Sequence, residues 1–311
     1  MPEGRLQEEL EALAARLGGL DLVEGVRRDH PVGPLTTYRV GGAAAVFVRP
    51  VDRDELRAIA TVTAGGPVPV AMVGRGSNLL VADGGYAGLV LQLGGGFDAV
   101  EVDGTRIVAG GGASLPVVAR HSVQEGLAGF EWAVGVPGSI GGAVRMNAGG
   151  HGSDMSAVLE SADVVDLSDG TDRRQSLDDL TLGYRTSSIT STQVVVSASL
   201  GLRPGDPAEG ESLLAEIVRW RRENQPGGTN AGSVFTNPAD DFAGRLIDLA
   251  GLKGLRHGSA VVSTKHANFI QADPGGRAGD VLALMREVQH RVAEAHGVDL
   301  HPETVLLGFD S

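Results

Sequence analysis

The sequence predicts an α+β protein with a larger N-terminal domain and a smaller C-terminal domain. Three observations predict this class: amphipathic helical patterns towards both ends, short β-like apolar runs between them, and a change of composition near residue 204. Arg203-Pro204-Gly205-Asp206-Pro207 holds two prolines and a glycine within five residues, which is typical of a domain boundary. A length of 311 residues also favours two domains.

Apolar residues at helical spacing predict the helices. The first and the last helix each show one apolar face, formed by Leu6, Leu10, Leu13 and Leu17 in the first and by Val281, Met285, Val288 and Val292 in the last. Further helices are expected over residues 52–63 and 114–124, and around 213–221 with an end before Pro226.

Short β-like runs account for most of the remaining regular structure. They lie at residues 45–48, 68–73, 89–93, 100–102, 107–109, 162–167, 194–200 and 268–271. Asp103-Gly104 separates two of these runs and is typical of a hairpin turn. Strands and helices are therefore mixed along the chain, as the α+β class requires.

Composition excludes several kinds of function. A formal net charge of −13 argues against a nucleic-acid or anionic-membrane partner, because both favour a basic surface. The absence of cysteine excludes disulfides, thiol nucleophiles and cysteine-based metal sites, and the eight histidines show no metal-ligand spacing, so no metal is expected. The N-terminal sequence lacks a signal-peptide pattern and no apolar run reaches about 18 residues, so a cytoplasmic protein is predicted. The protein is also expected to be a monomer.

Two glycine-rich segments are candidate cofactor loops. Gly74-Arg75-Gly76-Ser77-Asn78-Leu79 begins like a dinucleotide fingerprint, but Leu79 occupies the place of the third glycine, so the Rossmann pattern fails. A nest of backbone N–H groups that holds a phosphate and an ordinary tight turn both remain open for this segment. In the second segment, Gly135–Val144, small residues are expected to let the backbone lie flat against a planar or phosphorylated group. Two such loops in one domain favour a large cofactor, which any redox enzyme without cysteine would require.

The order of motifs along the chain resembles the UDP-N-acetylenolpyruvoylglucosamine reductase family, the MurB enzymes. The matching segments span residues 37 to 303 in the order of the family, and together they are specific although each could arise by chance. They are Thr37–Gly42, Gly74–Val81, Gly129–Trp132, Gly135–Gly149, Gly183–Arg185, Gly232–Pro238, Ala243–Ile247, Ala250–Gly254, Val262–Ile270 and Pro302-Glu303.

The resemblance implies a vanillyl-alcohol-oxidase (PCMH)-type FAD-binding domain over residues 1–204, with its core at about 37–203. It also implies a substrate-binding domain over 205–298 and a C-terminal strand over 299–311 that returns to the active site. The implied activity is a reduction of UDP-N-acetylglucosamine enolpyruvate to UDP-N-acetylmuramate for peptidoglycan synthesis. Noncovalent FAD is the implied cofactor, NADPH the reductant, and the UDP-sugar the small-molecule partner.

The resemblance also implies roles for individual residues. Arg185 matches the arginine that binds the substrate carboxylate, Ser233 the proton donor, and Glu303 the acid that supports the same carboxyl group. Outside this context, a surface or turn role would be the more common interpretation of all three. Asn237 and Lys265 are expected to contact substrate, with a turn and a surface role as open alternatives. The expected cofactor contacts are Tyr38, Arg39, Gly74, Arg75, Gly76, Ser77, Asn78, Leu79, Gly135, Val136, Pro137, Gly138, Ser139, Gly141, Gly142 and Ala143.

Three positions depart from the pattern of the family. Asn224 and Val305 stand where many relatives carry a lysine and an arginine, and His151 follows the Asn-Ala-Gly motif where a tyrosine is usual. One of Arg219, Arg221 and Arg222 could supply the missing charge, although a solvated helix face is the usual role for such residues. Two other functions therefore stay open: a different flavin oxidoreductase of the same fold acting on a sugar or alcohol, and a non-catalytic flavin- or nucleotide-binding paralogue.

Overall fold

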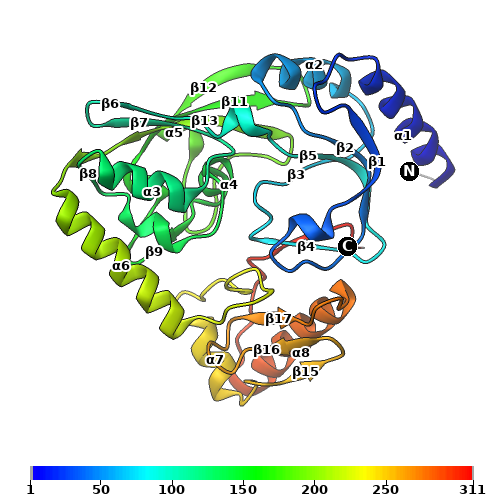
Figure 1. Ribbon diagram of the computed structural model, residues 1–311. Helices are drawn as coiled ribbons and strands as arrows, with labels where there is room; N and C mark the ends of the chain where they lie inside the picture. Colours follow the sequence, from blue (N-terminus) through cyan, green and yellow to red (C-terminus); the bar gives the residue numbers. More distant parts are fainter. Residues whose placement is uncertain (1–2, 310–311) are drawn as a thin grey trace. The chain divides into compact units, whose positions relative to one another are not determined.

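The computed structural model describes residues 3–309 and divides into two compact units (Figure 1). Unit 1 contains the described residues up to His30, with Ala45–Arg75 and Ala87–Trp220. Unit 2 contains Pro31–Ala44, Gly76–Tyr86 and the described residues from Arg221 to Phe309. Both units are therefore discontinuous in sequence, unlike the predicted domains.

The predicted domain bounds at residues 204 and 298 stay a prediction, and the compact units divide the chain differently. Two short N-terminal segments belong to unit 2 because Tyr38, Val40 and Leu80 lie in its hydrophobic core. Residues 1, 2, 310 and 311, the outermost parts of the first and last predicted domains, lie outside the described residues.

The chain forms eight α-helices within residues 3–309. They are α1 (Glu3–Gly18), α2 (Arg53–Thr63), α3 (Leu115–Gln124), α4 (Ile140–Met146), α5 (Leu177–Leu180), α6 (Pro207–Asn224), α7 (Ala243–Leu249) and α8 (Ala278–His296). All five helices predicted from apolar spacing are confirmed, as α1, α2, α3, α6 and α8. The short helices α4, α5 and α7 lack the length over which a helical period can be read.

Unit 1 is built on two sheets. A four-stranded sheet has the order β1-β2-β5-β3, from β1 (Val26–Pro31), β2 (Ala43–Val48), β5 (Tyr86–Leu91) and β3 (Val70–Met72). A five-stranded antiparallel sheet has the order β12-β11-β13-β7-β6, from β12 (Asp172–Ser176), β11 (Leu159–Asp166), β13 (Gln193–Gly201), β7 (Arg106–Gly110) and β6 (Val100–Asp103). The predicted hairpin at Asp103-Gly104 is confirmed, because Asp103 pairs with Arg106 and Gly104 has a φ of +60°.

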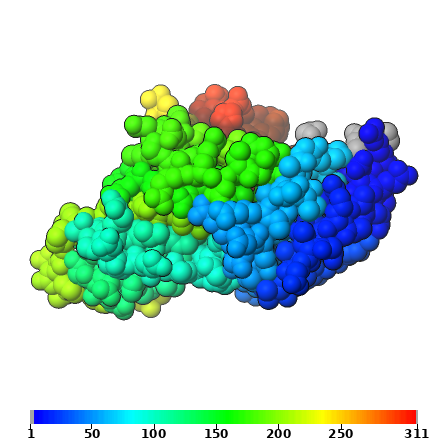
Figure 2. All heavy atoms as spheres, turned by 90° about the horizontal axis from the view of Figure 1, so that it is seen from above, coloured from blue at the N-terminus to red at the C-terminus, as the bar shows by residue number. Residues whose placement is uncertain are grey.

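Separate hydrophobic cores stabilise the two parts of unit 1. The leucines of α1 pack with Val46 and Leu89 of the four-stranded sheet. Its charged residues Glu8, Glu11 and Arg16 are exposed, and atoms of α1, dark blue in Figure 2, lie at the surface. A second core under the five-stranded sheet includes Ile140 of α4 and Val195 of β13. The small pairs β8 (Leu127–Ala128) with β14 (Arg203–Pro204), and β9 (Gly149–Gly150) with β10 (Ser153–Asp154), complete the unit.

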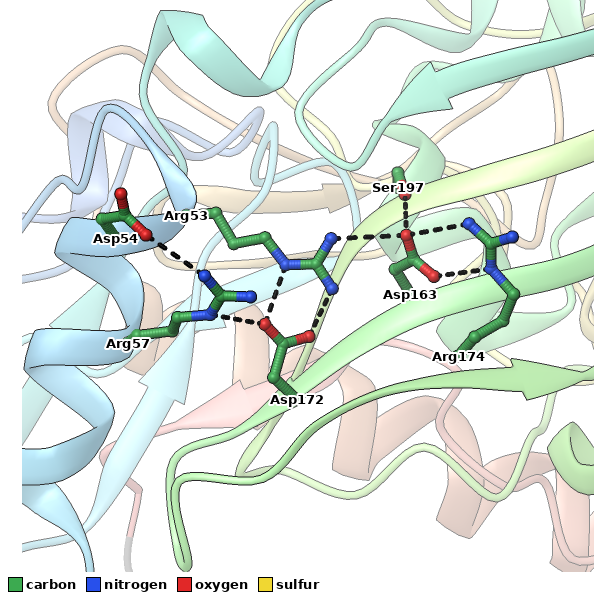
Figure 3. A network of polar contacts seen from close by, with 7 residues as sticks. All are labelled: Arg53, Asp54, Arg57, Asp163, Asp172, Arg174 and Ser197. Carbon is green, nitrogen blue, oxygen red and sulfur yellow. Dashed lines mark hydrogen bonds and ion pairs between the residues drawn. The ribbon is translucent and has the colours of Figure 1, made fainter.

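A network of ion pairs connects helix α2 to strands β11 and β12 (Figure 3). The Arg53 Nε donates to Asp172 Oδ2 at 2.8 Å, and the Arg57 Nε donates to the same oxygen at 2.7 Å. Neighbouring Asp163 accepts from Arg174 Nε at 2.8 Å. The hydrogen bond from Arg53 holds the pKa of Asp172 below its ordinary value, so this carboxylate stabilises the fold in its charged form.

Asp172→Asn should lower the free energy of unfolding by about 1–2 kcal/mol at pH 7, because the Asp172 side chain is only 12% exposed and accepts from two guanidinium groups. A lowered pKa in the folded state gives stability that is present above the unfolded pKa of about 4 and lost as the pH falls through the folded pKa. Urea unfolding at several pH values should therefore show the native chain and the variant converging below about pH 4.

Asp54→Asn is the matched control, because it removes a fully solvated partner of Arg57, with 91% of its side chain exposed. It should change the free energy of unfolding by no more than about 0.5 kcal/mol. Equal destabilisation by both substitutions would show that burial of the Asp172 pair is not what stabilises α2.

Unit 2 packs α7 and α8 on a small sheet. The sheet has the order β15-β16-β17, from β15 (Arg256–His257), β16 (Ala260–Val262) and β17 (Ile270–Ala272). A separate parallel pair joins β4 (Leu79–Val81) to β18 (Val305–Leu307). Asp83 ties the same segment to α8, because its carboxylate accepts from the N–H groups of Ala278 and Gly279 at 2.8 and 3.1 Å.

Within residues 3–309, no helix combines the length and the apolar character that a membrane-spanning segment needs.

Candidate functional site

The loop at residues 74–78 presents unused backbone donors. Three of its five carbonyl groups accept hydrogen bonds: Gly74 from Gln92 Nε2 at 2.9 Å, Gly76 from the Thr37 N–H at 3.0 Å, and Asn78 from the Val305 N–H at 3.0 Å. None of the five backbone N–H groups of residues 74–78 donates a hydrogen bond within the described part of the chain. Consecutive unpaired N–H groups are suited to an anionic ligand, so the nest interpretation is favoured over the ordinary turn.

Glycine is required at Gly76, and a side chain at Gly74 would need Ser139 to move. A Cβ at Gly76 would lie 2.3 Å from the carbonyl oxygen of Leu35, and Gly76 has a φ of +62°. A Cβ at Gly74 would lie 2.6 Å from the Ser139 Oγ. Gly74 and Ser139 both belong to unit 1, so this contact brings parts of the two glycine-rich segments together.

The expectation of a flat backbone through the second segment is wrong from Ser139 onward. Ser139 is the N-cap of α4, and its Oγ accepts from the Gly142 N–H at 3.3 Å. The N–H groups of Ile140 and Gly141 bond to the carbonyls of Ala113 and Gly111. Small residues serve close packing here, because a Cβ at Gly141 would lie 3.1 Å from the carbonyl oxygens of Gly111 and Val195. Cofactor contacts by residues 135–143 stay a prediction.

Tyr38 and Arg39 lie in different surroundings. Tyr38 is 0% exposed in the core of unit 2, and burial raises the pKa of its hydroxyl. Arg39 is exposed and has a φ of +56°. Arg75 and Gly74 are also exposed. The structure thus places Tyr38 as a core residue, and its predicted contact with a cofactor remains to be tested.

Ser233 and Glu303 lie on paired backbone segments of unit 2. The carbonyl of Val234, next to Ser233, accepts from the N–H of Glu303 at 2.7 Å, and Phe235 forms an antiparallel bridge with Pro302. Ser233 is half-buried, and its hydroxyl forms no hydrogen bond within residues 3–309. The structure therefore brings together two of the three predicted catalytic residues, which are 70 positions apart in sequence.

Asn268 fixes the loop that carries Ser233. Its side chain is 3% exposed, its Oδ1 accepts from the Phe235 N–H at 3.0 Å, and its Nδ2 donates to the Phe235 carbonyl at 2.8 Å. The Val234 N–H also donates to the Asn268 carbonyl at 2.9 Å. Asn268 is not among the site residues predicted from the sequence, although its buried amide satisfies both backbone groups of Phe235 and so positions the loop.

Arg185 is held by the turn after α4 in unit 1. It has a φ of +56°, and its guanidinium donates to the carbonyl of Gly149 at 3.0 Å. Asn147 shapes this turn: it has a φ of +38°, and its Nδ2 donates to the carbonyl of Gly183 at 2.9 Å. A non-glycine residue with positive φ often marks a functional site. The approach of Arg185 to Ser233 and Glu303, which belong to unit 2, stays a prediction.

Asn237 and Lys265 have local roles in unit 2. The Asn237 Oδ1 accepts from the N–H of Ala243 at 3.1 Å, at the start of α7. The Lys265 ammonium donates to the carbonyl of Arg222 near the end of α6, where a cation is favourable. Both side chains are exposed, and their contact with substrate stays a prediction.

The structure also shows the surroundings of His151, which departs from the family pattern, and of the three arginines near the end of α6. His151 packs edge-on against Trp220 with ring centroids 5.1 Å apart, next to Gly135. Arg219 and Arg222 are exposed, as expected of a solvated helix face. Arg221 is half-buried, its Nε donates to Gln225 at 2.8 Å, and burial lowers its pKa. Within residues 3–309, no group of three or more histidine, aspartate or glutamate residues is arranged to hold a metal ion.

Comparisons with known proteins give two domain matches. Residues 44–175 match an FAD binding domain, and residues 224–307 match the UDP-N-acetylenolpyruvoylglucosamine reductase C-terminal domain. The chain is 45% identical to the UDP-N-acetylenolpyruvoylglucosamine reductase of Paramagnetospirillum magneticum, over 90% of this chain and 91% of that protein. It is 38% identical to the reductase of Anoxybacillus flavithermus, over 98% and 99% of the two chains. The crystal structure of the enzyme from Thermus caldophilus matches with a TM-score of 0.80 and 36% identity, covering 91% of this chain and 99% of that one.

Proposed function

The chain belongs to the UDP-N-acetylenolpyruvoylglucosamine reductase family, and on this basis we propose that it reduces UDP-N-acetylglucosamine enolpyruvate to UDP-N-acetylmuramate. FAD is its cofactor and NADPH its reductant, and its product enters peptidoglycan synthesis. Identity of 38–45% over about nine-tenths or more of the chain supports this activity over another flavin reaction of the same fold.

The loop 74–78 fits the diphosphate of FAD. The five N–H groups that have no partner within residues 3–309 are the observation that carries the assignment, because a flavin dinucleotide brings two adjacent phosphates that need such donors. The exposed side chain of Arg75 adds positive charge beside them. Residues 135–143 would contact other parts of the same cofactor. Bound there, FAD reduced by NADPH would supply the hydride that adds to the terminal carbon of the enolpyruvyl group.

Three side chains complete the reaction in this proposal. Arg185 binds the enolpyruvyl carboxylate and stabilises the negative charge that spreads into it from the neighbouring carbon. Glu303 supports the same carboxyl group as it takes up this charge. Ser233 donates a proton to the neighbouring carbon, which completes the addition of two hydrogen atoms across the double bond. The hydroxyl of Ser233, which has no partner among the described residues, and the pairing of its loop with Glu303 support these roles.

Asn237 and Lys265 are proposed contacts for the UDP-sugar. The half-buried Arg221 is a candidate to supply the positive charge that many relatives carry at the positions of Asn224 and Val305. The proposed working form is a cytoplasmic monomer with predicted functional domains 1–204, 205–298 and 299–311. Its net charge of −13 supports a function without nucleic acid or anionic membrane as partner.

Purified protein titrated with FAD should take up the flavin and show its absorbance. Under anaerobic conditions, NADPH should bleach the bound flavin, and addition of UDP-N-acetylglucosamine enolpyruvate should restore the absorbance. A chain that does not take up FAD would contradict every flavin function. Flavin that is reduced by NADPH and reoxidised by oxygen but not by this substrate would favour a different oxidoreductase of the same fold.

A further inference from the structure

Asn78 connects the loop 74–78 to the segment that carries Glu303, and both lie in unit 2 from residue 76 onward. The Asn78 Nδ2 donates to the backbone carbonyl of Glu303 at 3.0 Å. The Asn78 carbonyl accepts from the N–H of Val305 at 3.0 Å. The geometry points to Asn78 as a positioning residue that fixes the backbone of Glu303, and thereby the direction of its carboxyl group.

The hydrogen bonds hold both peptide groups that flank the Cα of Glu303. Its N–H belongs to the peptide before the Cα and donates to Val234 at 2.7 Å. Its carbonyl belongs to the peptide after the Cα and accepts from Asn78. Because peptide groups are planar, fixing both restricts the φ and ψ of Glu303 and so sets the direction of its Cα–Cβ bond. The first bond comes from the Ser233 loop and the second from the loop 74–78.

The chemistry of an amide suits this position. The carbonyl of Glu303 needs a donor, which asparagine supplies and aspartate at neutral pH does not. Since its Nδ2 serves Glu303, Asn78 reaches an anionic ligand through its backbone N–H, which has no partner within residues 3–309. One residue therefore belongs to the cofactor loop by its backbone and to the Glu303 segment by its side chain.

The test compares the two half-reactions in the FAD-saturated enzyme, and it rests on the proposed role of Glu303. Asn78→Ala should slow the oxidation of the reduced enzyme by UDP-N-acetylglucosamine enolpyruvate by about 10–100-fold, as a misdirected reacting group does. Reduction by NADPH should stay within about threefold of the native rate, because Glu303 acts only on the second substrate. Asn78→Leu keeps nearly the size of the side chain, removes the donor and adds no negative charge beside the anionic cofactor, so it gives the same comparison if the alanine variant does not retain FAD.

Gln92→Ala is the matched control. The Gln92 amide also donates to a carbonyl of this loop, that of Gly74 at 2.9 Å, but it does not contact Glu303. If the substitutions only loosened the loop, the second half-reaction would slow in both variants alike. If Asn78 positions Glu303, this half-reaction slows in Asn78→Ala alone. Equal rates for the two variants would overturn it.

A double-mutant cycle shows whether Asn78 acts through Glu303. In the Glu303→Gln background, Asn78→Ala should slow the second half-reaction by no more than about twofold further, because coupled residues are not additive. If the rate reductions caused by Asn78→Ala and Glu303→Gln multiplied in full in the double variant, the positioning role would be overturned and the proposed function would stay intact. If Glu303→Gln alone kept the native rate, the proposed role of Glu303 would fail, and the role of Asn78 would fail with it.

Discussion

Ser233→Ala should slow the oxidation of the reduced enzyme by UDP-N-acetylglucosamine enolpyruvate by about 10²–10⁴-fold, the range that a positioned proton donor supplies. Reduction by NADPH should remain nearly unchanged, because it needs no proton from this hydroxyl. Stopped-flow absorbance of the flavin under anaerobic conditions measures both steps in one preparation.

The structure supports a selective effect of this substitution. The Ser233 hydroxyl forms no hydrogen bond within residues 3–309, so its removal costs no intramolecular bond, and Asn268 continues to hold the neighbouring Phe235 backbone. The free energy of unfolding should therefore stay within about 0.5 kcal/mol of the native value. An equal fall in both half-reactions would show that Ser233 shapes the site in general and is not the proton donor.

Gly76→Ala should lower the free energy of unfolding by about 3 kcal/mol or more and should weaken FAD binding strongly. The new Cβ would lie 2.3 Å from the Leu35 carbonyl oxygen and 2.6 Å from the Thr36 Cα. Both are backbone atoms, so neither can move away unless the chain around it moves too. The φ of +62° adds strain for any residue with a Cβ. Relief of the contact would displace the loop that presents the unpaired N–H groups.

Gly84→Ala is the control for this prediction. Gly84 lies in the same segment of unit 2, and a Cβ there would have no neighbour within 4 Å. Urea unfolding should show that the free energy of unfolding changes by no more than about 0.5 kcal/mol. Titration with FAD should give the same dissociation constant as for the native protein. Similar losses in both glycine variants would show that the close approach to Leu35 does not maintain the loop.

Local sequence patterns predicted a large part of the fold. The leucines of α1, the apolar face of α8 and the Asp103-Gly104 hairpin depend on residues a few positions apart, where side-chain period and turn chemistry act directly. The same holds for the loop 74–78, because Gly74 and Gly76 by themselves predict a tight turn or a nest of backbone N–H groups. Ser233 and Glu303 were found through their motifs, because their own residue types are common on protein surfaces.

What the sequence determined by itself was the α+β class, the long helices, the glycine-containing loop at residues 74–78 and the family, since each is encoded in short stretches of chain. Only the tertiary structure showed that β4 pairs with β18, that Asp83 caps α8, that Tyr38 lies in a core, and that Asn78 holds Glu303. These contacts join residues about 190 or more positions apart, and no local period or turn signal specifies such a partner. They form because burying Val40, Leu80 and their neighbours in one core offsets the entropy lost when the long intervening chain is closed.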